Sequence, residues 1–555
     1  MASMLRRVPL LAVLALALTA MAAVAAVGGE RGSGGAWDPP QTEETPTPRP
    51  EPACPDRHPD WRAAQTVMGV EVQADPQCQP DNPELVASFV KGTNNVNQTT
   101  LDDLALHEEA VEKCCDRDGD GDPDVINITI EALEINGFHL ESDDLASPYH
   151  IAPGIHPTFW TFAPKSTIDH AGEAFRDIAR QPSPPMRVEV GDEVHLTLEN
   201  THYFPHTVHL HGVDHAFQDE DGEGNDGVPD VSEAPIRPGE ERTYEFTPRQ
   251  AGTMFYHCHV QPDVHVAMGL TGILRVEEER DNNTVQTFNP GAGLVRHPAE
   301  GVSEDHDRQY DYHYQNVDKQ LHEIPQQRND PRELAREMHR TYDSTERDAD
   351  YFLLNGRSFP YTARESNIVI DEGESALVHM VSGGEDTHSI HTHGHKPTIV
   401  AKDGVPLEEP VQRDVFTMTA AQRLDIVINA TNNGLDSYGP GTWFMHDHRE
   451  EATTTDGINP GGDISMVVYE DRMNETTAMP EHAGSWDLLF TDEYYEGEIP
   501  VFADLGMPWI HGDVANASDE DEDRSTLPVA TGPVVGLSLL AAGLAHTRTR
   551  GGERS

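Results

Sequence analysis

The chain has 555 residues, and its 97 acidic side chains against 38 basic ones give a formal net charge of −59. This length leaves room for two to four domains with a sizeable core. The shortage of basic residues excludes nucleic acid as a partner, because no basic patch is available to contact phosphates.

The two ends of the chain predict export and attachment to a membrane. Residues 1–27 carry Arg6 and Arg7 near their start, followed by an apolar run, which is the pattern of a secretory signal peptide. The arginine pair leaves export by the twin-arginine route open. After an acidic tail over residues 472–526, the apolar segment 527–545 is just long enough to span a bilayer, and arginines follow it. We expect a protein held at the cell surface by this anchor, or a secreted one in which the segment is a processed sorting tail.

Residues 28–124 are predicted to form a flexible linker and a cysteine-containing extension. This region holds an even number of cysteines, which fits disulfide pairing in an exported protein: Cys54, Cys78, Cys114 and Cys115. The adjacent Cys114 and Cys115 are not expected to bond to each other, so links to Cys54 and Cys78 are predicted. The fifth cysteine, Cys258, stands alone and is better interpreted as a metal ligand.

An acidic loop over residues 116–124 resembles a calcium-binding loop. Its carboxylates alternate around glycines, and the candidate ligands are Asp116, Asp118, Asp120 and Asp122. The twelfth position of the loop is Asn127 rather than a bidentate glutamate, and no helix is predicted on either side. The alternative interpretation is a solvated acidic turn.

The rest of the chain favours an all-β fold. Short alternating or β-branched runs separated by Gly, Pro and Asp turns predict β-sandwiches, with strands expected at 126–130, 187–198, 242–246, 368–382 and 423–430. We predict one sandwich domain over residues 125–280 and a second over residues 351–471. The polar residues 281–350, with one helical stretch near 331–341, are predicted to be an inter-domain connection.

Two matched sets of histidines recur in the two predicted domains. Their motifs are His206-x-x-His209-x-His211 with His257-Cys258-His259, and His388-x-x-His391-x-His393 with His446-Asp447-His448. Random placement of 30 histidines gives about 1.6 H-x-H pairs, so chance does not explain two matched pairs of them. Because alternate residues of a strand face opposite ways, His257 and His259 share one face while Cys258 occupies the other. One backbone segment can therefore serve two metal centres.

These motifs resemble those of the multicopper oxidase family, in its two-domain, laccase-like form. Further matching segments are Asp226-Gly227-Val228-Pro229 and Ala234-Pro235-Ile236-Arg237-Pro238-Gly239. The resemblance covers roughly residues 125–471. It implies two cupredoxin-like Greek-key β-sandwich domains, and the acidic composition resembles that of proteins from extreme halophiles.

The resemblance also implies how copper would be held. A type 1 (blue) copper would take His206, Cys258 and His265, with Leu270 or Met268 as the axial neighbour. The spacing from Cys258 to His265 is two residues longer than is usual in the family. The type 2 copper would be bound by His209 and His391, and the type 3 pair by His211, His257, His259, His393, His446 and His448. Because Asp447 cannot replace a thiolate, the second domain is expected to hold no blue copper.

The implied activity is one-electron oxidation of a phenolic, aromatic amine or metal-ion donor, coupled to four-electron reduction of dioxygen to water by about four coppers per chain. Asp226 and Asp447 are the candidate proton donors, with a solvated carboxylate or turn residue as the alternative for each. In two-domain members of the family that the chain resembles, the first domain of one subunit meets the second domain of its neighbour, so the resemblance implies a homotrimer with the cluster at subunit interfaces. The alternatives are a copper nitrite reductase and a non-catalytic electron-carrying cupredoxin.

Overall fold

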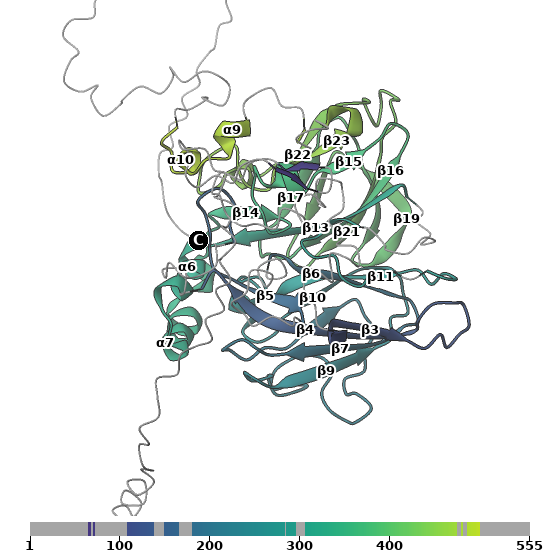
Figure 1. Cartoon of the computed structure of the whole chain (residues 1–555), viewed down its shortest axis with the longest axis vertical. Coiled ribbons are helices and arrows are strands. Elements are labelled where there is room, and N and C mark those ends of the chain that lie inside the picture. Colours follow the sequence, from purple (N-terminus) through teal and green to yellow (C-terminus); the bar gives the residue numbers. More distant parts are fainter. Residues whose placement is uncertain are drawn as a thin grey trace, which may run out of the picture. The chain divides into compact units, whose positions relative to one another are not determined.

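The structure is a computed structural model that describes residues 65–67, 70–72, 108–137, 149–165, 180–283, 285–295, 306–473, 479–480 and 486–499. The predicted signal peptide, the predicted anchor, Cys54 and Cys78 lie outside these residues. Among the described residues, no helix is long and apolar enough to cross a membrane. Apart from the short pair β1 (Gln65–Val67) and β2 (Val70–Val72), the described strands build two sandwiches (Figure 1).

The first sandwich contains a five-stranded and a four-stranded sheet. The five-stranded sheet runs β3 (Val111–Cys114), β4 (Val125–Ile135), β7 (Glu193–Glu199) and β9 (Glu241–Phe246), with β5 (Phe159–Pro164) paired to β4. The other runs β6 (Ser183–Glu189), β11 (Thr271–Glu277), β10 (Gly252–His257) and β8 (His209–His211). Along β7, Val194, Leu196 and Leu198 are buried and alternate with partly exposed polar residues. This period of two places one face of the strand in the core.

The second sandwich is built in the same way from a seven-stranded and a five-stranded sheet. The larger sheet runs β12 (Gly293–Leu294), β13 (Arg308–Val317), β16 (Ser375–Ser382), β21 (Arg423–Asn429), β18 (Thr398–Lys402) and β19 (Val405–Gln412), with β14 (Tyr351–Leu354) paired to β13. The smaller runs β15 (Ile368–Ile370), β23 (Ser465–Tyr469), β22 (Thr442–Asp447), β17 (His388–Thr392) and β20 (Val415–Met418). The predicted all-β fold is confirmed.

The sandwiches also include strands from segments predicted to lie outside them. β3 joins the first sandwich ahead of residue 125, and β12 and β13 belong to the second sandwich although residues 281–350 were predicted to be a connection. In β13, Tyr310, Tyr312 and Tyr314 are buried in the core of the second sandwich. The intervening polar residues are buried as well, because they face the first sandwich. Polar residues buried at an interface resemble a loop in the sequence, and this is why the strand was missed.

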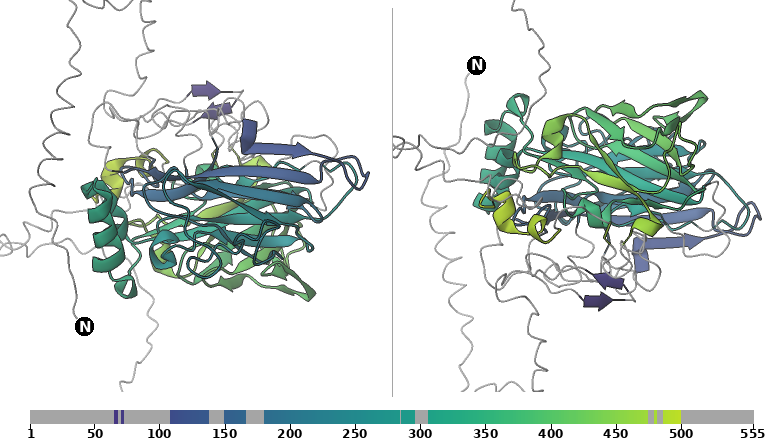
Figure 2. Two further views of the ribbon diagram at one scale, coloured as in Figure 1. Left: turned by 90° about the horizontal axis from the view of Figure 1, so that it is seen from below. Right: turned by 90° about the horizontal axis from the view of Figure 1, so that it is seen from above.

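The helical stretch predicted near residues 331–341 is confirmed. It consists of α7 (Pro331–Arg336) and a single π-helical turn, η3 (Glu337–Thr341), and it follows α6 (Lys319–Gln327). Asp330 caps α7 by accepting a hydrogen bond from the Arg332 amide, and Pro331 occupies the first helical position, as is typical of helix starts. Leu334 and Met338 are buried in the core cluster of the first sandwich. Figure 2 shows α6 and α7 side by side at one end of the strands.

Buried polar contacts join the two sandwiches. Arg187 on β6 donates from Nη2 to Oδ1 of Asp311 on β13 at 2.5 Å, and Asn289 donates from Nδ2 to the other carboxylate oxygen at 2.7 Å. Arg187 and Asp311 are both fully buried. Near them, Phe255 and Ile273 of the first sandwich pack against Val381 of the second. The contact between the sandwiches therefore has an apolar part and a charged part.

The structure corrects the predicted disulfide pattern. Cys114 and Cys115 are bonded to each other, although adjacent cysteines were expected to find separate partners. Cys114 ends β3, and Cys115 adopts a positive φ of 71° at the start of the acidic loop.

Candidate metal centres

The three predicted blue-site ligands lie together in the core of the first sandwich. The Cys258 sulfur is 3.5 Å from Nδ1 of His206 and 3.4 Å from Nδ1 of His265. All three side chains are at most 1% exposed. The longer spacing between Cys258 and His265 is taken up by a short helix, α5 (Pro262–His265), which returns His265 to the sulfur.

The electrostatics of this pocket fit a soft cation. Burial raises the pKa of the Cys258 thiol to about 12 and lowers the pKa of His206 to about 3. The imidazole is therefore neutral and able to donate a lone pair, while the thiol needs a cation to become a thiolate. Nε2 of His206 lies 2.8 Å from Nδ1 of His202, so a proton shared between these atoms leaves Nδ1 of His206 free to face the sulfur. One thiolate and two imidazoles are the donor set that suits copper.

Both candidate axial residues, Leu270 and Met268, are fully buried. The Leu270 carbonyl accepts from the Cys258 amide at 3.0 Å, and the Leu270 amide donates to the His265 carbonyl at 3.2 Å. Met268 is bonded through its backbone to Trp160 and Val264 instead. These bonds place Leu270 next to two of the three ligands, and the choice of axial residue stays a prediction.

A helical cover, made up of α7 and η3, closes the pocket on the side of His265. The His339 ring, on η3, lies 5.3 Å from the His265 ring and 5.3 Å from the Phe204 ring, measured between centroids. Ser344 donates to the Asp263 carboxylate on α5 at 3.3 Å, so the chain after the cover is tied to the ligand-bearing helix. His339 was missed in the sequence, because a single histidine in a polar segment has no motif to mark it.

The four predicted cluster ligands of the first sandwich form one group. Ring centroids are 5.1 Å apart for His209 and His211, 5.0 Å for His211 and His257, and 5.2 Å for His209 and His259. Nε2 of His211 and Nε2 of His257 face each other at 3.0 Å. Nδ1 of His257 donates to the Cys258 carbonyl at 2.8 Å, which fixes the tautomer and leaves Nε2 free for a metal.

The second sandwich repeats this arrangement with His391, His393, His446 and His448. Rings of His391 and His393 are 4.8 Å apart, and Nε2 of His393 faces Nε2 of His446 at 3.3 Å. Carbonyl oxygens again accept from Nδ1, at 2.8 Å for His391 and 2.9 Å for His446. Each sandwich therefore presents four imidazoles whose free nitrogens converge.

Within the described part of the chain, no ring contact joins the two histidine sets. The set on the second sandwich is open to solvent, with the His448 side chain 53% exposed. Large apolar side chains are exposed on both sandwiches: Phe217 and Val231 on the first, and Val405, Val415, Leu435, Tyr438 and Phe444 on the second. Phe444 lies on β22, two residues before His446.

The two candidate proton donors lie in different surroundings. The Asp226 carbonyl accepts from Nδ1 of His209 at 2.6 Å, and its carboxylate is 2.9 Å from Nε2 of His215 and partly exposed. Asp447 is fully buried and faces away from the histidine set, toward Nδ1 of His388 at 3.2 Å. Asp226 is therefore the carboxylate placed to exchange protons near the first set.

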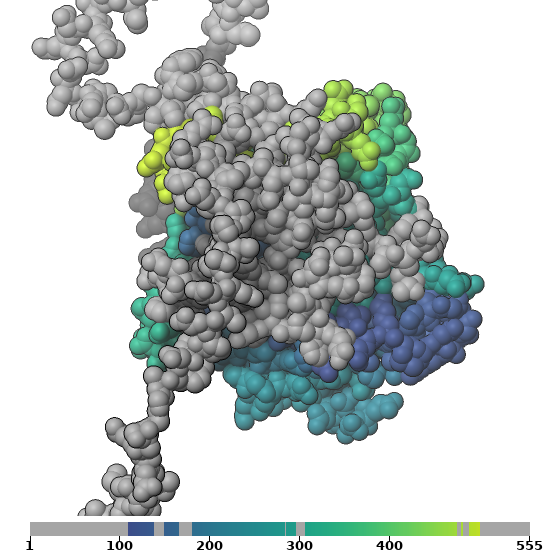
Figure 3. Space-filling view, in the orientation of Figure 1, coloured from purple at the N-terminus to yellow at the C-terminus, as the bar shows by residue number. Residues whose placement is uncertain are grey.

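The acidic loop brings carboxylates together on the surface. Asp116, Asp118 and Asp124 place oxygens within 4.8 Å of one another, as do Asp118, Asp120 and Glu279. Asp122 does not join either group; it accepts from the Asn283 amide at 2.7 Å. Two members of these groups were not predicted: Asp124, which lies at the end of the loop, and Glu279, which follows β11 and is distant in sequence. The segment lies at the surface (blue in Figure 3).

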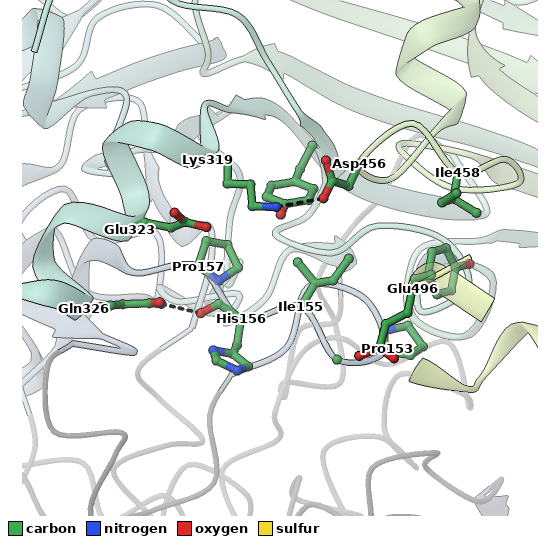
Figure 4. Close-up of a pocket in the computed structure, with 13 residues that line it drawn as sticks. Pro153, Ile155, His156, Pro157, Lys319, Glu323, Gln326, Asp456, Ile458 and Glu496 are labelled. Atoms are coloured by element: carbon green, nitrogen blue, oxygen red, sulfur yellow. Dashed lines mark hydrogen bonds and ion pairs between the residues drawn. The ribbon is translucent and has the colours of Figure 1, made fainter. Parts of the chain in front are cut away.

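A separate pocket of about 580 Å³ lies beside α6 (Figure 4). Its polar lining includes an ion pair between Lys319 and Asp456 at 2.9 Å and a hydrogen bond from Gln326 to the His156 carbonyl at 2.7 Å. None of its lining residues belongs to the histidine sets or to the blue site.

Comparison with known proteins identifies both sandwiches. Residues 179–281 and residues 329–456 each match a family model described as multicopper oxidase, and these segments contain all predicted copper ligands. The chain is 26% identical to Laccase-2 of Botryotinia fuckeliana over 306 residues, 53% of this chain and 47% of that protein. It is 22% identical to the oxidoreductase tpcJ of Aspergillus fumigatus over 308 residues, 54% of this chain and 45% of that protein. The matches thus span less than half of either relative.

Among solved structures, the blue copper oxidase from Nitrosomonas europaea is 26% identical, with a TM-score of 0.44, covering 62% of this chain and 85% of that one. The two matched segments of the present chain are multicopper oxidase domains. Their order along the chain is the same as that of the two histidine sets.

Proposed function

We propose that this protein, which carries two multicopper oxidase domains, is a laccase-like oxidase that couples one-electron oxidation of a small donor to four-electron reduction of dioxygen to water. One observation carries the proposal: the buried Cys258 faces His206, and its two sequence neighbours, His257 and His259, belong to a set of four imidazoles. The second sandwich presents a second set of four imidazoles. Bound copper would supply the redox chemistry, with about one type 1, one type 2 and two type 3 ions per chain.

The chain itself supplies a short connection between the two kinds of site. His257 and Cys258 are adjacent, and the His257 ring also donates to the Cys258 carbonyl. The blue site and the cluster ligands are therefore joined by covalent bonds and by one hydrogen bond. Asp226 holds or delivers a proton at its carboxylate beside His209, with His215 as its hydrogen-bond partner. Asp447 takes no direct part in this proposal.

The oligomer we propose is a homotrimer in which the first sandwich of one chain meets the second sandwich of its neighbour. Each sandwich holds only four of the eight cluster histidines, and the set with His391 and His448 opens to solvent beside exposed apolar residues. A head-to-tail ring completes every site with one kind of interface. Light scattering should give three times 61.2 kDa. A monomer with a full copper complement would rule this assembly out.

Copper content and oxygen uptake test the function together. The oxidase requires about four coppers per chain, a nitrite reductase about two and an electron carrier one. Purified protein in concentrated salt should consume dioxygen with phenols, aromatic amines or metal ions as donors, and should not reduce nitrite. Nitrite reduction with two coppers per chain, or one copper without oxygen uptake, would refute the proposal. The eight histidines argue against the reductase, whose type 2 site needs only three.

The remaining proposals rest on sequence patterns and are tested separately. Export with a C-terminal anchor is checked by fractionating cells that produce the full chain. Calcium at the acidic loop, at the group of Asp116, Asp118 and Asp124 or at the group of Asp118, Asp120 and Glu279, is checked by thermal unfolding with calcium or magnesium at equal ionic strength. A rise in melting temperature that is specific to calcium is expected, whereas equal effects of both ions would identify a solvated acidic turn.

A further inference from the structure

A third group of metal-binding side chains lies in the second sandwich, where the first sandwich has its blue site. His388 precedes His391 by three residues, as His206 precedes His209, and Asp447 stands between two histidines as Cys258 does. Asp463, two residues before β23, completes the group. The three side chains are at most 1% exposed.

The group contains two buried carboxylates and one imidazole. Nδ1 of His388 is 3.2 Å from Oδ2 of Asp447 and 3.9 Å from Oδ2 of Asp463. Oδ1 of Asp447 accepts from the amides of Ser389 and Arg449, and Oδ1 of Asp463 accepts from the Asp447 amide. Oδ2 of Asp463 is buried and has no hydrogen-bond partner.

Within the group, two carboxylates face one imidazole, and the neighbouring guanidinium of Arg449 is partly exposed and paired with Asp386 and Glu451. Even a protonated His388 supplies one positive charge against two carboxylates. A buried carboxylate oxygen without a partner is destabilising. A cation between the three side chains would give Oδ2 of Asp463 a partner and would neutralise the two carboxylates.

We propose that a non-copper divalent cation, zinc or manganese, is bound by Nδ1 of His388, Oδ2 of Asp447 and Oδ2 of Asp463. Two ligands that each lie about 2.1 Å from one tetrahedral ion are about 3.4 Å apart. The observed separations of 3.2 and 3.9 Å bracket this value. Two carboxylates neutralise the ion, and a nitrogen and oxygen donor set without sulfur suits these borderline or hard cations rather than a blue copper.

The ion would hold cluster ligands in place. His388 lies on β17 with His391, and Asp447 ends β22 between His446 and His448. A cation bound to both strands and to Asp463 fixes their positions where the four imidazoles must converge. Corresponding positions of the two sandwiches would then bind different metals. The first sandwich would hold the proposed blue copper, and the second would hold a structural ion. This inference concerns a metal other than copper and does not depend on the proposed oxidase activity.

Metal analysis of the full-length protein tests the inference. Wild-type protein should contain about one equivalent of zinc or manganese per chain after exhaustive dialysis, and Asp463→Asn should lose most of it. The matched control is Asp425→Asn, which alters another buried His–Asp pair of the same sandwich, with His379 Nδ1 2.8 Å from the Asp425 carboxylate. This control should retain the ion. Absence of a non-copper equivalent, a fifth equivalent that is copper, or retention in Asp463→Asn would overturn the proposal.

A second measurement uses only the wild-type protein, in case Asp463→Asn does not fold. Anomalous X-ray scattering from crystals, recorded on both sides of the zinc and manganese absorption edges, should give a peak between the three side chains. A water molecule, or no density, at that position would overturn the proposal whatever the variant does.

Discussion

The Arg187–Asp311 ion pair between the sandwiches gives a sharp prediction for stability. The variant Arg187→Met keeps the apolar stem of the side chain and leaves Asp311 buried with Asn289 as its remaining side-chain partner. Removing one member of a buried pair typically costs about 3–5 kcal/mol, because the other charge stays desolvated. For sandwiches of this size, that cost corresponds to a fall in melting temperature of roughly 6–20 °C.

The assay is thermal unfolding followed by circular dichroism at several potassium chloride concentrations. The exposed pair of Arg332 and Asp330 provides the control, and Arg332→Met should leave the melting temperature unchanged. The double variant Arg187→Met/Asp311→Leu should recover most of the loss, since it removes both charges.

The salt dependence of the melting temperature distinguishes the contribution of the buried ion pair from that of the acidic surface. The net charge of −59 makes wild type and variants alike more stable in concentrated salt. The difference between wild type and Arg187→Met should nevertheless stay constant, because a buried pair is little screened. A shift within about 2 °C, or a difference that disappears in concentrated salt, would show that the pair does not hold the sandwiches together.

Three further predictions concern the blue site and its surroundings. Cys258→Ser should lower the copper content from about four to three per chain and abolish donor oxidation, measured by metal analysis and oxygen uptake; four coppers in this variant would contradict the ligand assignment. His339→Ala should leave the blue absorption unchanged while raising kcat/KM for bulky phenols more than for metal ions, because it opens the edge of His265; equal changes for both donor classes would show that the cover does not select donors. Burial raises the pKa of Glu134 to about 7 despite hydrogen bonds from Tyr203 and Trp160, so the folded state holds a proton that the unfolded state has released. Stability should therefore fall by about 2–3 kcal/mol as the pH rises from about 4.5 to 7, and Glu134→Gln should remove that part of the fall in denaturant titrations.

The sequence predicted those parts of the fold and site that repeat. Spacing and strand alternation placed the flanking histidines of Cys258 on one face, and in the structure the rings of His257 and His259 stack with their centroids 5.7 Å apart. The predicted strands at 126–130 and 242–246 fall within β4 and β9. Both depend on local periodicity, which a sequence displays directly.

Features that depend on distant contacts were not predicted. The strand β13 looked like a linker because its polar residues meet the other sandwich, where Asp311 finds Arg187. Asp463 lies in a turn with no motif, and only the fold brings it near His388. The bond between Cys114 and Cys115 joins neighbouring residues, a pairing that residue type alone does not indicate.

The helical cover lies between β13 and β14, two strands of the second sandwich, and it reaches the blue site of the first sandwich without supplying any of its three ligands. His339 approaches the ring of His265, and Ser344 ties the same segment to α5. On the proposed function, the residues that would meet the electron donor and those that would hold the copper thus lie in separate stretches of chain. Substitutions in the helical cover are then expected to change which reductant is used without altering any proposed copper ligand.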